Sequence, residues 1–264
     1  MRSLKKKRAA FNIPKQHGAW ISIFACFALG LIVAKRFDFK SLLLLISIVA
    51  GFLLRYNISE SIKDFGKFKQ LLFPILLYFL ILAISGLTLL FYYRLIILIP
   101  LGVIPAVSAF SYLYFERIGK PTSTISEIIG MLGIATIAPA AYYVASKSFD
   151  IRAAGIWIVS LLFFICSVFI VRYLARNRLP RNTAEYIKSA KIPFSVCATS
   201  VILAYLLGKA DFLPGYAFIS IAPSLILFLL LSAAKKRFKI KTIGIVSTIN
   251  ITIFVILSAI SFIS

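Results

Sequence analysis

Apolar residues run together along most of this chain, in segments of about twenty residues bounded by charged positions, which is the length that a helix needs to cross a bilayer. The run LLLLISIVAGFLL (42–54) does not alternate between apolar and polar residues, as a strand of a membrane β-barrel would. A helix satisfies all its backbone hydrogen bonds within one segment, and lipid requires this. The pattern therefore predicts an all-α polytopic membrane protein.

Nine transmembrane helices are predicted, and together they form a single transmembrane helical domain over residues 1–264. No hydrophilic stretch is long enough for a separate soluble domain. The second span is short, so we expect it to continue as helix beyond Tyr56. The predicted spans cover about 18–34, 41–54, 71–91, 95–115, 124–145, 152–171, 192–208, 214–232 and 242–262.

Charge then predicts the orientation. The chain is 61% hydrophobic, with a net charge of +22. If the N-terminus lies in the cytoplasm, 23 of the 30 lysines and arginines fall on that side, as expected for cytoplasmic loops. This places the C-terminus outside and predicts a multi-pass protein of the cell membrane, attracted to anionic lipid headgroups. The basic residues are scattered over several short loops, which argues against nucleic-acid binding. The sequence leaves the oligomeric state open.

The stretch RYNISESIKD (55–64) brings acidic residues to the inner end of the second span, in a chain with eight acids. If the helix continues, Asn57, Glu60 and Asp64 follow i, i+3, i+7 spacing and share a face. Glu60 and Asp64 are then one turn apart, where two carboxylates can hold a divalent cation. A solvated helix end with local ion pairs, involving Arg55 and Lys63, explains the same residues.

Two arginines follow the sixth span at the same predicted side. Arg172 and Arg176 are four residues apart and face one way if that helix continues. Guanidinium groups suit phosphate or carboxylate ligands. Anchoring of the inner side by positive charge explains them without any ligand.

Glu127 and His17 are polar residues at the start of predicted spans. Glu127 lies about one turn inside the fifth span, where an acid is costly unless it faces the bundle or a wet cavity. It is alternatively a first-turn acid favoured by the helix dipole, with a cap among residues 122–124. His17, the single histidine, has no partner ligands at metal-binding spacing, so it is a hydrogen-bonding residue at the interface or part of a binding site.

Several of these stretches resemble the YwiC-like family of bacterial and archaeal membrane proteins. They are PKQHGAW (14–20), SEIIGMLGIATIAPAAYYVAS (126–146) and LLFFICSVFIVRYLARNR (161–178), and the similarity is strongest at 14–20 and 112–178. That family supplies no biochemical activity that could be carried over to this chain.

The layout is more distantly similar to the UbiA superfamily of intramembrane prenyltransferases, which have nine helices and active-site loops after helices two and six. In those enzymes the first loop carries an Asn and spaced aspartates that hold magnesium on a prenyl diphosphate. The resemblance implies that Asn57, Glu60 and Asp64 are catalytic and that Glu60 and Asp64 hold Mg²⁺. The stretch YLYFER (112–117) is similar to the end of helix four in that superfamily, with Glu116 where a basic residue is usual.

The chain departs from that superfamily after helix six, where the second pair of aspartates has no counterpart and the arginines stand instead. The resemblance then implies a cytoplasm-facing cavity for a membrane lipid or prenyl diphosphate, in a divergent prenyltransferase. The expected substrate-binding residues are Arg55, Arg117, Arg172, Arg176, His17 and Glu127. The alternative is a non-catalytic membrane protein, either a transporter or an accessory subunit of a respiratory or lipid pathway. Pro105 and Pro139, which could break helices, and the mid-span amide of Asn250 keep that alternative open.

Overall fold

The structure is a computed structural model that describes residues 14, 17–64, 66, 68–120, 123–176, 183–233 and 238–263. Within these residues all regular secondary structure is helical, as predicted. The helices are α1 (His17–Ala34), α2 (Phe39–Lys63), α3 (Phe68–Leu87) with its π-helical continuation η2 (Thr88–Tyr92), α4 (Leu98–Arg117), α5 (Thr124–Ala135), α6 (Ile137–Ser146), α7 (Ile151–Arg176), α8 (Thr183–Lys209), α9 (Phe218–Ala233) and α10 (Ile240–Ile263).

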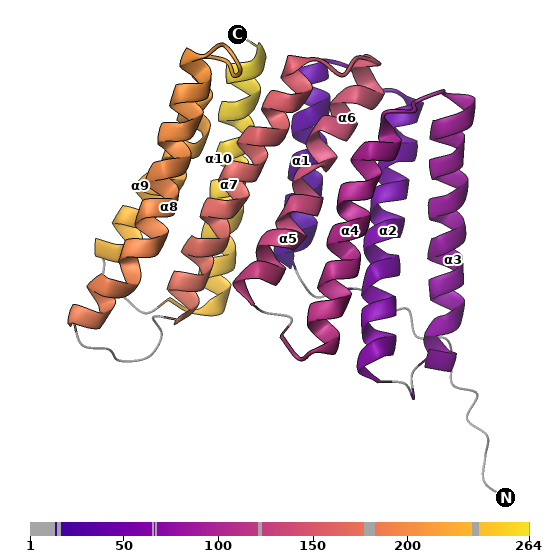
Figure 1. The fold of residues 1–264 in the computed structure, drawn as a ribbon, viewed down its shortest axis with the longest axis horizontal. Coiled ribbons are helices and arrows are strands. Elements are labelled where there is room, and N and C mark those ends of the chain that lie inside the picture. The colour runs from indigo at the N-terminus through magenta and orange to yellow at the C-terminus, as the bar shows by residue number, and fades with distance from the viewer. Residues whose placement is uncertain are drawn as a thin grey trace, which may run out of the picture.

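The long helices stand side by side as one bundle, with α3 at one edge and α8 and α9 at the other (Figure 1). Neighbouring pairs are α2 with α3, α4 with α5, α1 with both α6 and α10, and α7 with α8. We call the lower end in Figure 1 the inner end; it carries the first residues of α1, α5 and α10 and the last residues of α2, α4 and α7. The sequence predicts that this end faces the cytoplasm.

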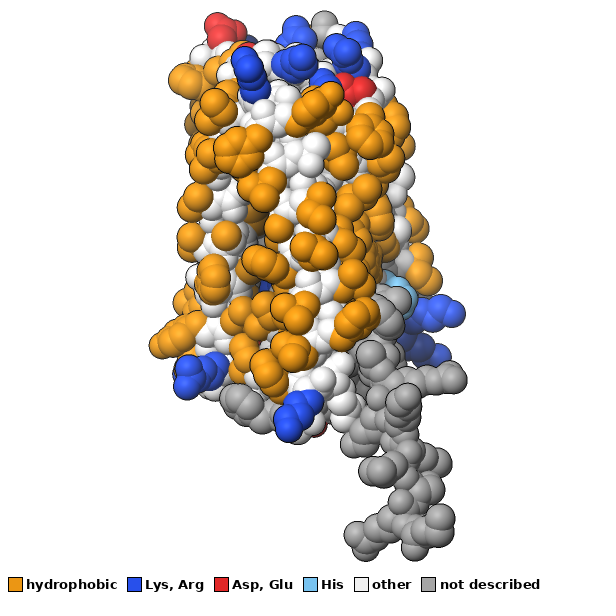
Figure 2. Space-filling model, turned by 90° about the vertical axis from the view of Figure 1, so that its right-hand side faces the viewer, with side chains coloured by type: hydrophobic (Ala, Val, Ile, Leu, Met, Phe, Trp, Pro, Cys, Tyr) orange, Lys and Arg blue, Asp and Glu red, His pale blue; other side chains and the backbone are white. Residues whose placement is uncertain are grey.

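Eight helical segments of the described chain are long and apolar enough to cross a membrane. Large apolar side chains cover the face around α3 as a broad band, with lysines and arginines gathered at its two ends (Figure 2). This surface suits lipid between two layers of water. The chain is therefore a helical membrane protein.

The second predicted span does continue as helix, from Phe39 to Lys63. Asp38 caps its start, because its Oδ1 accepts a hydrogen bond from the backbone N–H of Ser41 at 3.1 Å. At the other end Asp64 has left the helical conformation, with φ −142° and ψ 93°. The helix therefore extends past Tyr56 as predicted but ends one residue before Asp64.

The fifth predicted span, 124–145, is interrupted rather than continuous. It forms α5, which ends at Ala135, and α6, which begins at Ile137. Pro139 lacks the N–H that would bond the carbonyl of Ala135, and its ring crowds that carbonyl. The interruption at Thr136 therefore follows from Pro139, one of the two prolines that the sequence marks as potential helix breakers.

The eighth predicted span, 214–232, is wrong at its start. Residues 214–217 form a turn, in which Ala217 N–H donates to the carbonyl of Pro214 at 2.8 Å, and α9 begins only at Phe218. Its 16 residues rise about 24 Å, which is less than the hydrocarbon thickness of a typical bilayer. The structure thus has eight helical segments of spanning length and one shorter apolar helix among its described residues.

The outer half of the bundle is held by a close approach of α1 and α6. A Cβ atom added at Gly30 would lie 2.3 Å from the carbonyl oxygen of Ala138 and 2.8 Å from Cβ of Ala141. Small residues let two membrane helices approach at backbone distance. Every residue of α6 from Ile137 to Ala145 is buried as a result.

Candidate functional site

A cavity of about 1380 Å³ lies among the helices, and α1, α2, α3, α4, α5, α7 and α10 all contribute to its wall. It is larger than the pockets of about 300–1,000 Å³ that hold typical small molecules. Most lining side chains are apolar, and the ionisable ones other than Tyr112 are His17, Arg55, Glu127 and Lys241. These four belong to the inner parts of α1, α2, α5 and α10, so the cavity has an apolar body and a charged inner end.

Arg55 is held in this wall by aromatic rings. Its guanidinium carbon lies 4.3 Å from the ring centroid of Tyr112 on α4 and 5.5 Å from that of Phe52 on α2. Phe52 in turn meets Trp20 of α1 edge to face, at 4.9 Å between centroids. Stacking on an aromatic face stabilises a guanidinium and fixes its plane. Three helices therefore position Arg55 beside the cavity.

Glu127, which lines the cavity from α5, forms an ion pair with Arg172 of α7, at 2.8 Å between Oε2 and Nη1. Its side chain is 34% exposed and that of Arg172 is 18% exposed. The predicted cap is also present, since Ser123 Oγ accepts from Ser126 N–H at 3.1 Å. The first-turn interpretation of Glu127 is thus confirmed, and the pairing with Arg172 adds a charged contact at the cavity.

Lys63 ties α2 to α4 at the inner end. Its Nζ lies 3.0 Å from Glu60 Oε1 and 2.9 Å from Glu116 Oε1. The Glu116 side chain is only 3% exposed, whereas that of Lys63 is 48% exposed. The local ion pairing that the sequence offered as an alternative for Glu60 is therefore what the structure shows. The role of Glu116 as a buried acid was not predicted.

The three residues expected to share one face are placed differently. Asn57 is fully buried, and its Nδ2 donates to the carbonyl of Leu53 at 2.8 Å. Asp64 is exposed beyond the helix end, where its Oδ1 accepts from Gly66 N–H at 3.0 Å. Neither these two nor Glu60 lines the cavity.

This arrangement bears on the expected magnesium site. Glu60 is in contact with an ammonium group, and Asp64 is on a turn rather than on the helix face. Among the described residues no group of three or more His, Cys, Asp or Glu is placed to hold a metal ion. The donor set seen here does not fit Mg²⁺, which prefers a shell of oxygen ligands.

The remaining candidates differ in position. His17 is exposed at the start of α1 and lines the cavity, whereas Arg117, the last residue of α4, is exposed and outside its wall. Arg176 closes α7, but its side chain lies outside the described residues. Two cavity-lining polar residues, Tyr112 and Lys241, were not predicted as site residues. Tyr112 opens the YLYFER stretch, whose resemblance to UbiA enzymes was the signal that could have identified it, whereas nothing in the local sequence of Lys241 marks it as facing inward.

The family model described as YwiC-like protein matches residues 13–142, slightly less than half of the chain. The matched stretch includes 14–20 but reaches into 112–178 only as far as Tyr142. Comparisons with curated proteins and with solved structures gave no match. The part of the chain from just before α1 into α6 is thus similar to the YwiC-like protein family.

Proposed function

We propose that this membrane protein binds an anionic amphiphile with a long apolar tail, of the isoprenoid diphosphate class, in its intramembrane cavity. The observation that carries the proposal is the distribution of side chains in a cavity of about 1380 Å³, which has an apolar body and ionisable groups at its inner end. The anionic head would lie at that end and the tail would occupy the apolar body. The proposed opening toward the cytoplasm rests on the charge distribution of the sequence.

Arg55 is the residue proposed to bind the head. It lies eight residues before the end of α2, a rise of about 12 Å, and an uncompensated charge at such depth is costly. The electrostatic attraction of Glu116, the aromatic rings of Phe52 and Tyr112 and the adjoining cavity make that position tolerable. A guanidinium group donates to two phosphate oxygens at once, so an anionic head would be bound with defined geometry.

Lys241 and the Glu127–Arg172 pair extend the charged end. Lys241 is exposed at the second position of α10 and supplies a further positive charge. An anionic head could compete with Glu127 for Arg172, since both offer oxygen acceptors to the same guanidinium. The head groups of ordinary phospholipids carry a single phosphate, so a diphosphate would gain more from this cluster.

The tail contributes little to selectivity. A prenyl chain in the bilayer is already surrounded by hydrocarbon, so its transfer into an apolar cavity removes almost no surface from water. The discrimination between ligands therefore depends on their polar groups, above all on the anionic head.

Prenyl transfer and its Mg²⁺ requirement stay predictions from the resemblance to UbiA enzymes. The described acids do not form a donor set for magnesium, since Glu60 is paired with Lys63 and no group of three or more His, Cys, Asp or Glu among these residues is placed to hold a metal ion. Binding by Arg55 needs no metal.

The test is binding of geranylgeranyl diphosphate to the purified protein in nanodiscs, with and without Mg²⁺, and with diphosphate release as a second readout. Arg55→Gln should weaken binding about tenfold or more, because a hydrogen bond to a charged group contributes about 1.5–3 kcal/mol. Arg152→Gln, a change at an exposed position at the opposite end of the bundle, is the matched control. Equal affinities of the two variants would refute the proposed head site, and diphosphate release would establish the enzymatic version.

Transport of the same ligand is a second candidate, favoured by one observation. The helix interrupted at Thr136 lines the cavity on both sides of the break, through Gly133 and Ile137. Interrupted helices beside a midmembrane site are typical of transporters. Proteoliposomes that move a fluorescent isoprenoid phosphate no faster than protein-free liposomes would remove this candidate.

A further inference from the structure

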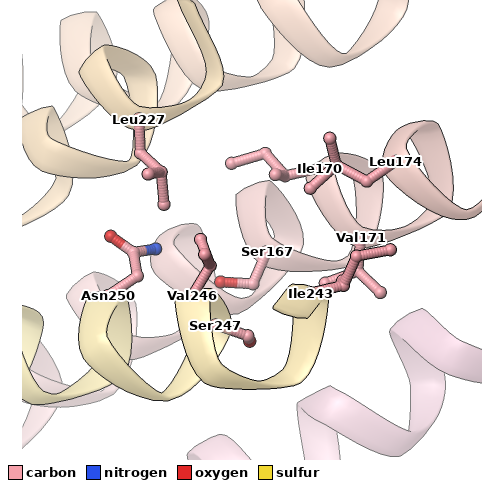
Figure 3. Close-up of a pocket in the computed structure, with 9 residues that line it drawn as sticks. All are labelled: Ser167, Ile170, Val171, Leu174, Leu227, Ile243, Val246, Ser247 and Asn250. Atoms are coloured by element: carbon pink, nitrogen blue, oxygen red, sulfur yellow. The ribbon is translucent and has the colours of Figure 1, made fainter. Parts of the chain in front are cut away.

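A small niche lies beside the large cavity, between α7, α9 and α10, and its wall is mainly apolar with three polar side chains. Nine residues line it, and four of them (Ser167, Val171, Ile243 and Ser247) also line the cavity, so the two spaces adjoin (Figure 3). Its volume is about 10 Å³, which is the space needed by the centre of a single oxygen-sized atom. The niche is therefore a one-atom recess in the wall.

Ser167 places an unsatisfied hydroxyl at this recess. Its Oγ is inaccessible to solvent and has no hydrogen-bond partner. Some serines of the bundle satisfy their hydroxyls locally, since Ser22 and Ser85 donate to the carbonyl four residues earlier in their own helices, at 2.9 Å and 2.7 Å. Others have no partner, as Ser167 has none, but among those serines only Ser167 lines the niche; they are Ser126, Ser160 and Ser258. A buried hydroxyl without a partner costs free energy, more so where lipid excludes water. An acceptor atom in the recess could therefore supply the hydrogen-bond partner that Ser167 lacks.

Asn250 supplies a second donor on the facing helix. The Ser167 hydroxyl is directed toward the side of the recess on which the Asn250 side chain lies (Figure 3). One N–H of its amide donates to Ser224 Oγ of α9 at 3.0 Å, and an amide nitrogen carries two. Ser224 is fully buried, so it fixes the amide while the other N–H remains for the recess.

We infer that this niche is a binding subsite for a single acceptor oxygen, held by the hydroxyl of Ser167 and the amide of Asn250. The oxygen belongs to a hydroxyl or carbonyl group of an otherwise apolar ligand, or to a water molecule. A charged group is unsuited, because the niche contains no ionisable side chain among its nine residues.

The position of the subsite gives it a role in ligand selection. Ser167 lies nine residues from the inner end of α7, a rise of about 14 Å, so the niche lies deep in the bundle. The inference rests on the proposed function, since the ligand that brings the oxygen would be the molecule occupying the cavity. A neutral oxygen on the tail would then distinguish one amphiphile from another, which apolar walls alone cannot do.

The test uses neutral probes, so that the charged end is not involved. The affinities of farnesol and of its hydrocarbon analogue farnesane for the full chain in nanodiscs are measured, both for the unchanged protein and for Ser167→Ala. Loss of one hydrogen bond should reduce the preference for farnesol about fivefold, the equivalent of about 1 kcal/mol. Ser220→Ala is the control, because the Ser220 hydroxyl donates to the carbonyl of Ala217 in a buried hydrogen bond and does not line the niche.

A second measurement identifies water as the source of the oxygen. In a crystal structure at a resolution that shows ordered waters, a water within hydrogen-bonding distance of Ser167 and Asn250 would support the subsite even without a preference for farnesol. No preference in the unchanged protein together with an empty niche would overturn the inference. Binding of geranylgeranyl diphosphate that depends on Arg55 would be unaffected by that outcome, so the two proposals fail separately.

Discussion

The contact of Lys63 with Glu60 and Glu116 leads to an asymmetric prediction about stability. Removing the lysine, as in Lys63→Met, should destabilise the protein more than neutralising its buried partner, as in Glu116→Gln. The reason is that Glu116 is nearly inaccessible to solvent whereas Lys63 is half exposed. A stranded buried charge costs more than a stranded charge in contact with water.

The expected magnitudes follow from the geometry. In Lys63→Met the Glu116 carboxylate loses its ion pair at 2.9 Å, and its Oε2 already has no hydrogen-bond partner. Breaking a buried pair in this way costs about 3–5 kcal/mol, and we expect about 3 because Arg55 still interacts electrostatically with Glu116. In Glu116→Gln the lysine keeps Glu60 at 3.0 Å. Arg55 loses the attraction of Glu116 but keeps its two aromatic rings, so we expect about 1 kcal/mol.

The measurement is reversible unfolding in mixed micelles with increasing denaturing detergent. The double variant Lys63→Met/Glu116→Gln should be close in stability to Glu116→Gln alone, because neutralising the acid removes the penalty that the first change creates. If Lys63→Met were no more destabilising than Glu116→Gln, the carboxylate would not depend on Lys63 and the reasoning would be refuted.

Two further predictions concern the helix ends and contacts. Gly30→Ala should lower the free energy of unfolding by about 3 kcal/mol, the upper end for overpacking, because the new methyl group would meet the backbone carbonyl of Ala138. Thermal unfolding in detergent measures this change, and a decrease of less than about 1 kcal/mol would contradict the prediction. Burial alone would raise the pKa of Asp38, but hydrogen bonds from Lys40 and the first turn of α2 outweigh it and hold that pKa below its usual value. The stabilisation by Asp38 should therefore be complete above about pH 3.9 and be lost as the pH falls through the lowered pKa, whereas an Asp38→Asn variant should show no such loss on acid titration.

The distribution of apolar residues was sufficient to predict most helices, since lipid accepts few other residues. It was not sufficient to predict where helices end. Asp64 lies outside α2, and α9 begins late, because local backbone conformation decides those boundaries. Pro139 did mark a break, whereas Pro105, which lacks an N–H in the same way, lies inside the continuous helix α4.

The site was harder to predict than the fold. Glu127 could be identified individually, because charge at membrane depth is conspicuous. Arg55 was expected as a basic residue just beyond the predicted end of the second span and not as a charge within a helix of the bundle. Their partners, Tyr112 and Arg172, lie far away in the sequence, and only the packing of helices brings them together. The niche at Ser167 was missed for the same reason, since a single serine in an apolar helix gives no signal.

The contacts of α1 have a consequence for biosynthesis. Its neighbours in the bundle are α6 and α10, and the latter ends at Ile263. During translation α1 enters the membrane before either neighbour exists, so the part of its packing face that α10 covers remains among lipids until α10 has been made. A nascent chain stalled just before residue 240 would keep that part of the face exposed, and quality-control proteases could distinguish it from a chain that contains α10.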